Sequence, residues 1–192
     1  MNSKQSPPLL HFILRYSDSL RSVDTYSAHK AIEARFGHVW WGKFGVGIGQ
    51  QYVHIARRQI RTGKTTYVYL ATKGSILYRA RVLDIIGGGR RTRYRPAQLT
   101  GVPSYYRKEA CTVWFKLSDL HRVPAGDQQR LVLYNDRLFA PQPKGMRGLI
   151  YVTHGTPRKR TSPTRSGTSS FRQHLPFADD DTYPIPPDEV VL

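Results

Sequence analysis

Short apolar runs along the chain predict a protein built mainly from β-strands. Runs rich in branched and aromatic residues are typical of strands. In one of them Arg79 and Arg81 alternate with Ala80 and Val82, which indicates a buried face and a partly basic face. The Lys-Gly pair at residues 73–74 predicts a hairpin turn before this run. The predicted strands cover residues 9–15, 66–72, 75–86, 111–117, 130–134 and 148–152.

Two segments predict helices. Ser27 is suited to cap a helix over residues 28–36, and Gly37 is suited to end it. A second helix is predicted over residues 50–61 and closes at Gly63. In the second helix, apolar residues at helical spacing are expected to face the core: Tyr52, Ala56 and Ile60.

Composition divides the chain into a domain and a tail. With 39% hydrophobic and 11% aromatic residues, the 192-residue chain has the material for a packed core. Residues 1–153 are predicted to form one folded domain. Residues 154–192 are rich in Pro, Ser and Arg before an acidic segment, so they are predicted to be a disordered tail.

Positive charge is concentrated in the predicted domain. The formal net charge is +17, and residues 1–152 carry 25 basic side chains against 8 acidic ones. Such a body attracts polyanions by counterion release, so nucleic acid, either DNA or RNA, is the expected partner. A basic surface that serves only solubility is the alternative. The residues expected to contact phosphates are Gly45, Gly47, Gly49, Arg57, Arg58, Arg61, Arg79, Arg81, Arg90, Arg91, Arg93 and Arg95.

Several other site chemistries find no support. Cys111 is the only cysteine, which excludes a disulfide framework and a zinc site built on several cysteines. The seven histidines show no metal-ligand spacing. The glycine series ending at Gly49 lacks the next glycine of a dinucleotide fingerprint at Gln50, and residues 62–65 lack the leading glycine of a phosphate-binding loop at Arg58. We therefore expect no metal and no cofactor.

Catalysis and membrane insertion are also not expected. Asp84 and Asp119 have no evident acidic or basic partner in the sequence, so acid–base catalysis finds little support. No apolar run reaches the ~18 to 20 residues that span a bilayer, and residues 1–8 do not resemble a signal peptide. The expected location is cytoplasmic or nucleoid-associated.

Doubled aromatic residues suggest a base-binding surface. Trp40 and Trp41 point to opposite faces if they lie on a strand, so at most one is expected to fill the core. Tyr105 and Tyr106 repeat this doubling in a loop. In a strongly basic protein such residues stack on bases or enclose a flipped base. For each single aromatic residue, a place in the core remains the simpler interpretation.

The order of elements resembles the EVE domains, members of the PUA-like superfamily that includes YTH and ASCH domains. The resemblance lies in the tryptophan-containing turn of residues 39–49, the helix segment 52–58 and the strand 67–70. It continues through residues 76–86, a charged variable loop, and residues 113–117. In all it covers roughly residues 9–152 of this chain.

The resemblance implies an α+β fold, a small, closed, twisted β-barrel flanked by helices, with an aromatic cage that holds a modified base such as a methylated one. The matching wall positions would be Trp41, Tyr69, Tyr78 and Trp114, while the doubled Trp40 and the arginine-rich loop depart from the pattern. EVE-like domains often act in modification-dependent defence, so a separate effector protein is an implied partner. The complete set of candidate base-binding residues is Trp40, Trp41, Tyr69, Tyr78, Tyr105, Tyr106 and Trp114.

The leading expectation is therefore a non-enzymatic module that binds nucleic acid, and two other functions stay open. One is a small ribonuclease-like enzyme that cleaves nucleic acid with His38 or His54 and a lysine. The other is an adaptor that recruits a partner protein through residues 171–177 or 184–187 of the tail.

Overall fold

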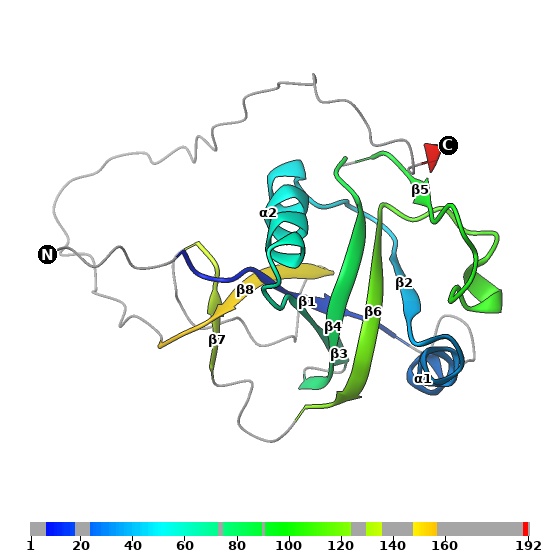
Figure 1. Ribbon diagram of the computed structural model, residues 1–192, viewed down its shortest axis with the longest axis horizontal. Helices are drawn as coiled ribbons and strands as arrows, with labels where there is room; N and C mark the ends of the chain where they lie inside the picture. Colours follow the sequence, from blue (N-terminus) through cyan, green and yellow to red (C-terminus); the bar gives the residue numbers. More distant parts are fainter. Residues whose placement is uncertain are drawn as a thin grey trace, which may run out of the picture.

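A seven-stranded mixed β-sheet forms the centre of the protein (Figure 1). The computed structural model describes residues 7–17, 24–72, 75–89, 91–123, 130–135, 148–156 and 190–191. The strand order is β2-β6-β4-β3-β1-β8-β7, in which only β1 and β3 are parallel neighbours. The α+β class is confirmed. The strands are β1 (His11–Arg15), β2 (Val39–Lys43), β3 (Tyr67–Thr72), β4 (Ser75–Gly87), β6 (Val113–Arg122), β7 (Leu131–Leu133) and β8 (Leu149–His154).

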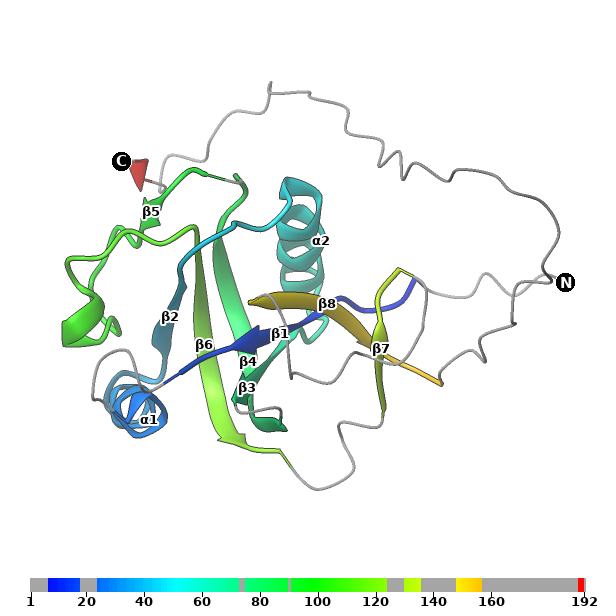
Figure 2. The same cartoon turned by 180° about the vertical axis from the view of Figure 1, so that it is seen from behind.

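The sheet curls around its apolar interior. Phe12 on β1 and Phe115 on β6 have ring centroids 5.3 Å apart, although β3 and β4 lie between these strands in the sheet. At one end Tyr16 contacts Trp41 of β2, with ring centroids 5.6 Å apart. Figures 1 and 2 show β1 crossing β4 and β6 at a steep angle. The hydrogen-bonded order of the described strands ends at β2 and β7, so the result is a barrel-like sheet with two edges.

Helix α1 (Thr25–Phe36) packs against β2 and β6. Its N-cap is Asp24, whose Oδ1 accepts a hydrogen bond from the Ser27 backbone N–H at 3.0 Å. The predicted cap at Ser27 is therefore wrong, because the Asp24 carboxylate accepts from the first turn and the helix begins before Ser27. The predicted end at Gly37 is confirmed, since this residue has a φ of 72°.

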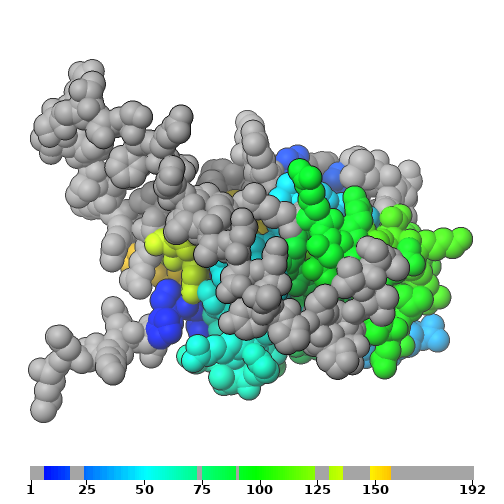
Figure 3. Space-filling view, turned by 90° about the horizontal axis from the view of Figure 1, so that it is seen from above, coloured from blue at the N-terminus to red at the C-terminus, as the bar shows by residue number. Residues whose placement is uncertain are grey.

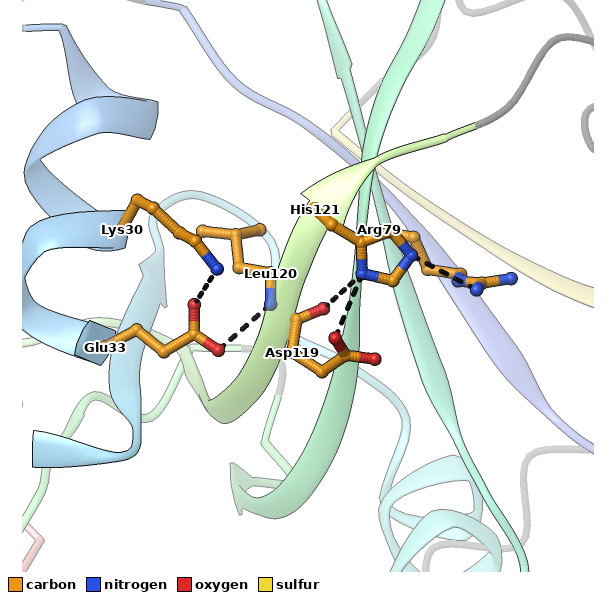
Figure 4. Close-up of polar contacts among 6 residues, drawn as sticks. All are labelled: Lys30, Glu33, Arg79, Asp119, Leu120 and His121. Carbon is orange, nitrogen blue, oxygen red and sulfur yellow. Dashed lines mark hydrogen bonds and ion pairs between the residues drawn. The ribbon is translucent and has the colours of Figure 1, made fainter.

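A buried carboxylate joins α1 to the sheet. Glu33 accepts hydrogen bonds from the Leu120 backbone N–H at 3.0 Å and from Lys30 Nζ at 2.9 Å (Figure 4). The register between β4 and β6 shifts beside Leu120, and Asp119 at this point has a positive φ of 55°. The irregularity leaves the Leu120 N–H to the helix instead of the neighbouring strand.

Helix α2 (Gln50–Arg61) buries one face in the interior of the sheet. Its buried residues are Val53, Ala56 and Gln59. The Gln59 side chain accepts from the Leu10 backbone N–H at 2.7 Å and donates to the Leu10 carbonyl oxygen at 3.1 Å and to Thr66 Oγ1 at 2.8 Å. This network fixes the helix to the chain segments that enter β1 and β3.

The predicted apolar stripe of α2 is only partly confirmed. Ala56 is fully buried, whereas Tyr52 and Ile60 are half-buried at the margins of the buried face. Tyr52 stacks on Tyr151 of β8 with ring centroids 3.7 Å apart. A polar residue, Gln59, occupies the buried position because its amide satisfies backbone groups there.

Three hydrophobic clusters stabilise the domain. The interior cluster lies inside the curled sheet and contains Phe12, Trp41 and Phe115, with Val53 and Ala56 of α2. The lateral cluster surrounds β1, β3 and β8 on another face: Ile13, Tyr69, Ala71, Ile76, Leu131 and Val152. The outer cluster lies on the outward face of β2, β4 and β6 and includes residues of the segment between β4 and β6. Its members are Trp40, Ile86, Tyr94, Val102, Tyr106, Cys111 and Trp114.

The remaining described elements are short. The 3₁₀ helix η1 (Ser104–Tyr106) lies in the loop before β6. Strands β5 (Tyr94–Arg95) and β9 (Val190–Val191) form a separate antiparallel pair. The predicted hairpin turn at residues 73–74 and most of the predicted tail at 154–192 lie outside the described residues, so the domain boundary at 153 stays a prediction.

Candidate nucleic-acid interface

A groove of about 810 Å³ lies between α2, the outer face of β2, β4 and β6, and the loop at residues 97–100. Figure 3 looks onto the face where cyan residues of α2 and green residues of the segment from β4 to β6 reach the surface. We call this space the α2 groove. Its lining residues are His38, Trp40, His54, Arg57, Ile60, Arg61, Leu83, Asp84, Ile86, Ala97, Gln98, Thr100 and Lys116.

Three permanent cations line the α2 groove, and they come from two elements. Arg57 and Arg61 lie one turn apart on α2, and Lys116 comes from β6. The Arg57 Nε donates to the Ile85 carbonyl oxygen at 3.0 Å, which holds its guanidinium against β4. Lys116 Nζ lies 5.9 Å from the centroid of the Trp40 ring. The groove therefore presents positive charge from both α2 and β6 to an anion.

A bulge in β4 determines which side chains enter the α2 groove. Val82 pairs with Leu117 and Asp84 pairs with Lys116, so Leu83 is an extra residue in β4. Val82 points into the interior cluster, while both Leu83 and Asp84 line the groove. A regular strand would have sent one of these two consecutive side chains inward. The Asp84 Oδ1 accepts the backbone N–H of Ile85 at 2.8 Å.

Two histidines also line the α2 groove. The ring nitrogens of His38 lie 3.1 Å from the Phe36 carbonyl oxygen and 3.3 Å from the Thr100 carbonyl oxygen. These contacts hold His38 between the end of α1 and the loop that closes the groove. His54 lies on the exposed face of α2. The groove thus contains both histidines that the sequence made candidates for nucleic-acid cleavage.

The structure places the candidate aromatic residues in different environments. Trp40 is 7% exposed and is the one candidate that lines the α2 groove. The walls implied by the resemblance do not surround one space, because Trp41 lies in the interior cluster, Tyr69 in the lateral cluster and Trp114 in the outer cluster. Tyr78 stacks on Tyr26 of α1, with ring centroids 3.7 Å apart.

The expectation that at most one of the adjacent tryptophans fills a core is wrong. They do point to opposite faces of β2, as predicted, but both faces are covered. Tyr106 contacts Trp114 in the outer cluster, and Tyr105 packs on Tyr106. The loop before β6 thus supplies the second apolar environment.

A buried histidine connects this loop to the interior. His29 of α1 lies against Trp41, with ring centroids 4.0 Å apart, and its Nδ1 is 3.2 Å from Tyr105 Oη. Burial lowers the pKa of His29 to about 4, against the opposing effect of the Thr25 and Trp40 backbone groups. A neutral imidazole therefore fills this position at neutral pH, and it serves the packing of the loop.

The candidate phosphate contacts divide in a similar way. Arg57 and Arg61 are in the α2 groove, whereas Arg58 lines a smaller cavity of about 370 Å³ on another side of α2. Arg79 packs over the Tyr67 ring at 4.6 Å, and Arg81 is exposed on the same strand.

The arginine-rich loop is partly tied to its neighbour. Arg93 Nη1 donates to the Ala110 carbonyl oxygen at 3.1 Å, and Arg95 Nη2 donates to the Lys108 carbonyl oxygen at 2.6 Å. Arg91 is exposed, and Arg90 lies outside the described residues. These arginines are outside the lining of the α2 groove.

The predicted glycine-rich anion site has a different arrangement. Gly49 is the N-cap of α2, and its backbone N–H donates to Tyr151 Oη at 3.4 Å. Lys43 Nζ donates to the Phe44 and Val46 carbonyl oxygens and so closes the loop that contains Gly45 and Gly47. These contacts occupy groups that an anion would otherwise use, and the three glycines are not among the lining of the α2 groove.

Sequence reasoning missed two groove residues with clear chemistry. Lys116 lies in an apolar strand and is not among the residues predicted to contact phosphates, although its outward position follows from alternation with Phe115 and Leu117. The sequence presents Asp84 only as a carboxylate with no evident partner. The bulge that directs it into the groove depends on pairing with β6, and the sequence of β4 alone carries no signal for it.

Within the described part of the chain, no group of three or more histidine, cysteine, aspartate or glutamate side chains could hold a metal ion. No described helix is long and apolar enough to cross a membrane.

Comparison with known proteins identifies a family but no individual relative. The chain matches the sequence model of the family described as Pua-like over residues 12–148. No curated protein and no solved structure matches the chain. The matched segment runs from β1 to the residue before β8 and includes every residue that lines the α2 groove.

Proposed function

The chain belongs to the Pua-like family, whose domains typically bind nucleic acids, and from this premise we propose that it is a non-enzymatic nucleic-acid-binding protein that uses the α2 groove. In this proposal a backbone phosphate lies between Arg57, Arg61 and Lys116. One unstacked base lies beside Trp40. The proposal covers DNA and RNA, because phosphate groups and base edges are common to both.

One observation carries the proposal: the groove combines cations with apolar wall in a single hollow. Arg57, Arg61 and Lys116 line it together with the apolar side chains of Ile60, Leu83, Ile86 and Trp40. A phosphate alone would need only the cations. A wall of this kind beside them suits the flat face of a base, which is apolar, next to its charged backbone.

A preference for a modified base is the finer part of the proposal, and with it the EVE-type assignment. A methyl group that contacts Leu83 or Ile86 would lose hydration and gain about 0.8 kcal/mol if fully buried, which is about fourfold in affinity. Matched strands with and without a methylated base test this part. Equal affinities would reject recognition of the methyl group, but they would not contradict nucleic-acid binding itself.

The test of nucleic-acid binding uses fluorescence anisotropy with labelled single-stranded and duplex DNA and RNA. Each phosphate contact contributes about −0.9 to the slope of log affinity against log salt for duplex DNA, so three groove cations predict a slope near −3 or steeper. A flat salt response would overturn the proposal.

Two neighbouring arginines on α2 provide a matched comparison. Arg61→Gln should weaken binding and reduce the salt slope by about one contact, because Arg61 lines the groove. Arg58→Gln removes the same charge from the same exposed last turn of α2, but it lies outside the groove and should have little effect. Equal effects of the two variants would show a diffuse attraction instead of a site in the groove.

Cleavage of nucleic acid is a second candidate, because His38, His54 and Lys116 line the same groove. If the protein cleaves RNA without metal, His38→Ala or His54→Ala should reduce the rate by about a hundredfold or more. Absence of turnover by the wild-type protein, with and without divalent metal ions, would reject the enzyme and favour a binding protein.

A further inference from the structure

Asp84 places a negative charge in a groove that otherwise attracts anions. It is the one acidic side chain among the lining residues, which include Arg57, Arg61 and Lys116. Its carboxylate forms no ion pair within 4.0 Å with any described residue; its described hydrogen bond is the one from the Ile85 N–H. A carboxylate here repels phosphate, so binding of the nucleic-acid backbone does not explain it.

The local structure of β4 fixes the position of the Asp84 side chain. The extra residue Leu83 rotates Asp84 out of the sheet and into the groove. The hydrogen bond from the Ile85 N–H to Oδ1 then fixes the side chain, and Arg57 is anchored to the same residue through the Ile85 carbonyl oxygen. One short segment of β4 therefore positions a cation and a hydrogen-bond acceptor side by side.

A carboxylate accepts hydrogen bonds and donates none. Among the groups on base edges, it suits the exocyclic amino groups of cytosine and adenine and the N–H groups of guanine. Uracil and thymine present a carbonyl oxygen where cytosine presents its amino group, and two acceptors facing each other repel. Their N3–H is a donor, but it lies between two carbonyl oxygens that both repel a carboxylate. An acceptor held in this place therefore separates cytosine from uracil, which have the same size.

We propose that Asp84 is a specificity residue of the α2 groove, which accepts a hydrogen bond from the amino group of an unpaired base and so selects cytosine over uracil. This inference rests on the proposed function, since it requires that a nucleic acid occupies the groove. It adds the chemical class of the ligand: a single-stranded or flipped base that carries an amino group.

The test compares oligo(dC) with oligo(dU), and oligo(C) with oligo(U), as labelled strands of about ten nucleotides at fixed salt and neutral pH. The wild-type protein should bind the cytosine strand at least about fivefold more tightly than the uracil strand of the same sugar type. Equal affinities would overturn the role of Asp84. Absence of binding to every strand would instead overturn the proposed function itself.

The variant Asp84→Asn separates base reading from charge. The asparagine carbonyl can still accept the Ile85 N–H and keep the bulge, while its amide can donate to the uracil oxygen. We expect the variant to bind oligo(dU) more tightly and to lose the preference for oligo(dC). An equal gain for both strands would show that Asp84 only lowers the general affinity for polyanions, and would overturn the inference.

The matched control is Asp119→Asn. Asp119 is an exposed acid on β6 outside the groove, and asparagine tolerates its positive φ. This variant makes the same change in net charge. It should leave the ratio of cytosine to uracil affinity unchanged, and a ratio that changes as much as in Asp84→Asn would likewise count against the inference.

Discussion

Trp40 and Trp41 are neighbours in the sequence, yet their side chains belong to hydrophobic clusters on opposite faces of β2. Trp41 lies in the interior cluster and is 3% exposed. Trp40 lies in the outer cluster and presents its remaining surface to the α2 groove. The pair therefore connects the core of the fold to the candidate binding site through one peptide unit.

Removal of the Trp41 side chain should destabilise the fold strongly. Trp41→Ala takes a large ring from the interior, where it contacts His29 and Tyr16, and should lower the free energy of unfolding by about 3 to 5 kcal/mol. Urea denaturation followed by tryptophan fluorescence or circular dichroism measures this loss. A loss below about 1 kcal/mol would contradict the placement of Trp41 in the interior cluster.

The two tryptophans should differ in binding when each is replaced by a smaller aromatic residue. Trp40→Phe should weaken nucleic-acid binding several-fold, because the indole lines the groove and base stacking on such a ring contributes about 1 to 3 kcal/mol. Trp41→Phe should leave the affinity of the folded protein unchanged. Anisotropy titrations on both variants, at a temperature where both are folded, compare them. The opposite ranking would move the base-binding surface to the interior side of β2.

The contact between Glu33 and the Leu120 backbone N–H should contribute more to stability than the ion pair that Glu33 forms with Lys30 (Figure 4). Glu33→Ala leaves a buried N–H without its acceptor and should lower the free energy of unfolding by about 1 to 3 kcal/mol. Lys30→Ala removes an exposed partner and should cost less than about 1 kcal/mol. Urea denaturation of both variants tests this order, and equal losses would contradict it.

The sequence was sufficient for the features that depend on local pattern. Alternation placed Ala80 and Val82 inward and Arg79 and Arg81 outward, which the structure confirms for β4. Most strands and both helices follow from apolar runs and turn residues, and the family match confirms the PUA-like part of the resemblance. These features are local because a period of two or of 3.6 residues is already visible within one element.

The features that the sequence could not supply depend on distant partners. The bulge at Leu83 is defined by pairing with β6, about thirty residues later in the chain, so nothing in β4 predicts that Asp84 enters the groove. The burial of Trp40 depends on a loop that brings Tyr94 and Tyr106 over β2. The resemblance implied one cage with walls at Trp41, Tyr69, Tyr78 and Trp114, whereas the structure distributes these residues over three clusters.

Acid should destabilise the protein through His11. Burial lowers the pKa of His11 from 6.5 to about 3, and the positive charges of His154 and Arg79 act in the same direction. In the unfolded chain the His11 imidazole is protonated as the pH falls through 6.5, whereas in the folded chain it stays neutral until about pH 3. The contribution of His11 to stability is constant above this pH and falls between pH 6.5 and about 3, with about 2 kcal/mol lost by pH 5.

A variant that cannot titrate isolates this contribution. His11→Gln retains an acceptor for the Tyr67 backbone N–H, which lies 3.2 Å from His11 Nδ1, and should lose about 2 kcal/mol less than the wild type between about pH 7 and 5. Urea denaturation across this pH range gives the two curves. Parallel curves for His11→Gln and the wild type would contradict the assignment.

Removal of residues 157–192 should leave the melting temperature of the domain nearly unchanged. The buried residues of the three clusters lie between Leu10 and Val152, and the described contact that the truncation removes is the two-residue pairing of β9 with β5.

The removed segment carries five basic and five acidic side chains, so the domain keeps its net charge and should keep its salt-dependent binding. Calorimetry and a salt titration measure both. A fall of more than about 4 °C, the effect of at least about 1 kcal/mol in a domain of this size, would show that these residues pack on the domain and that the predicted boundary at 153 is wrong.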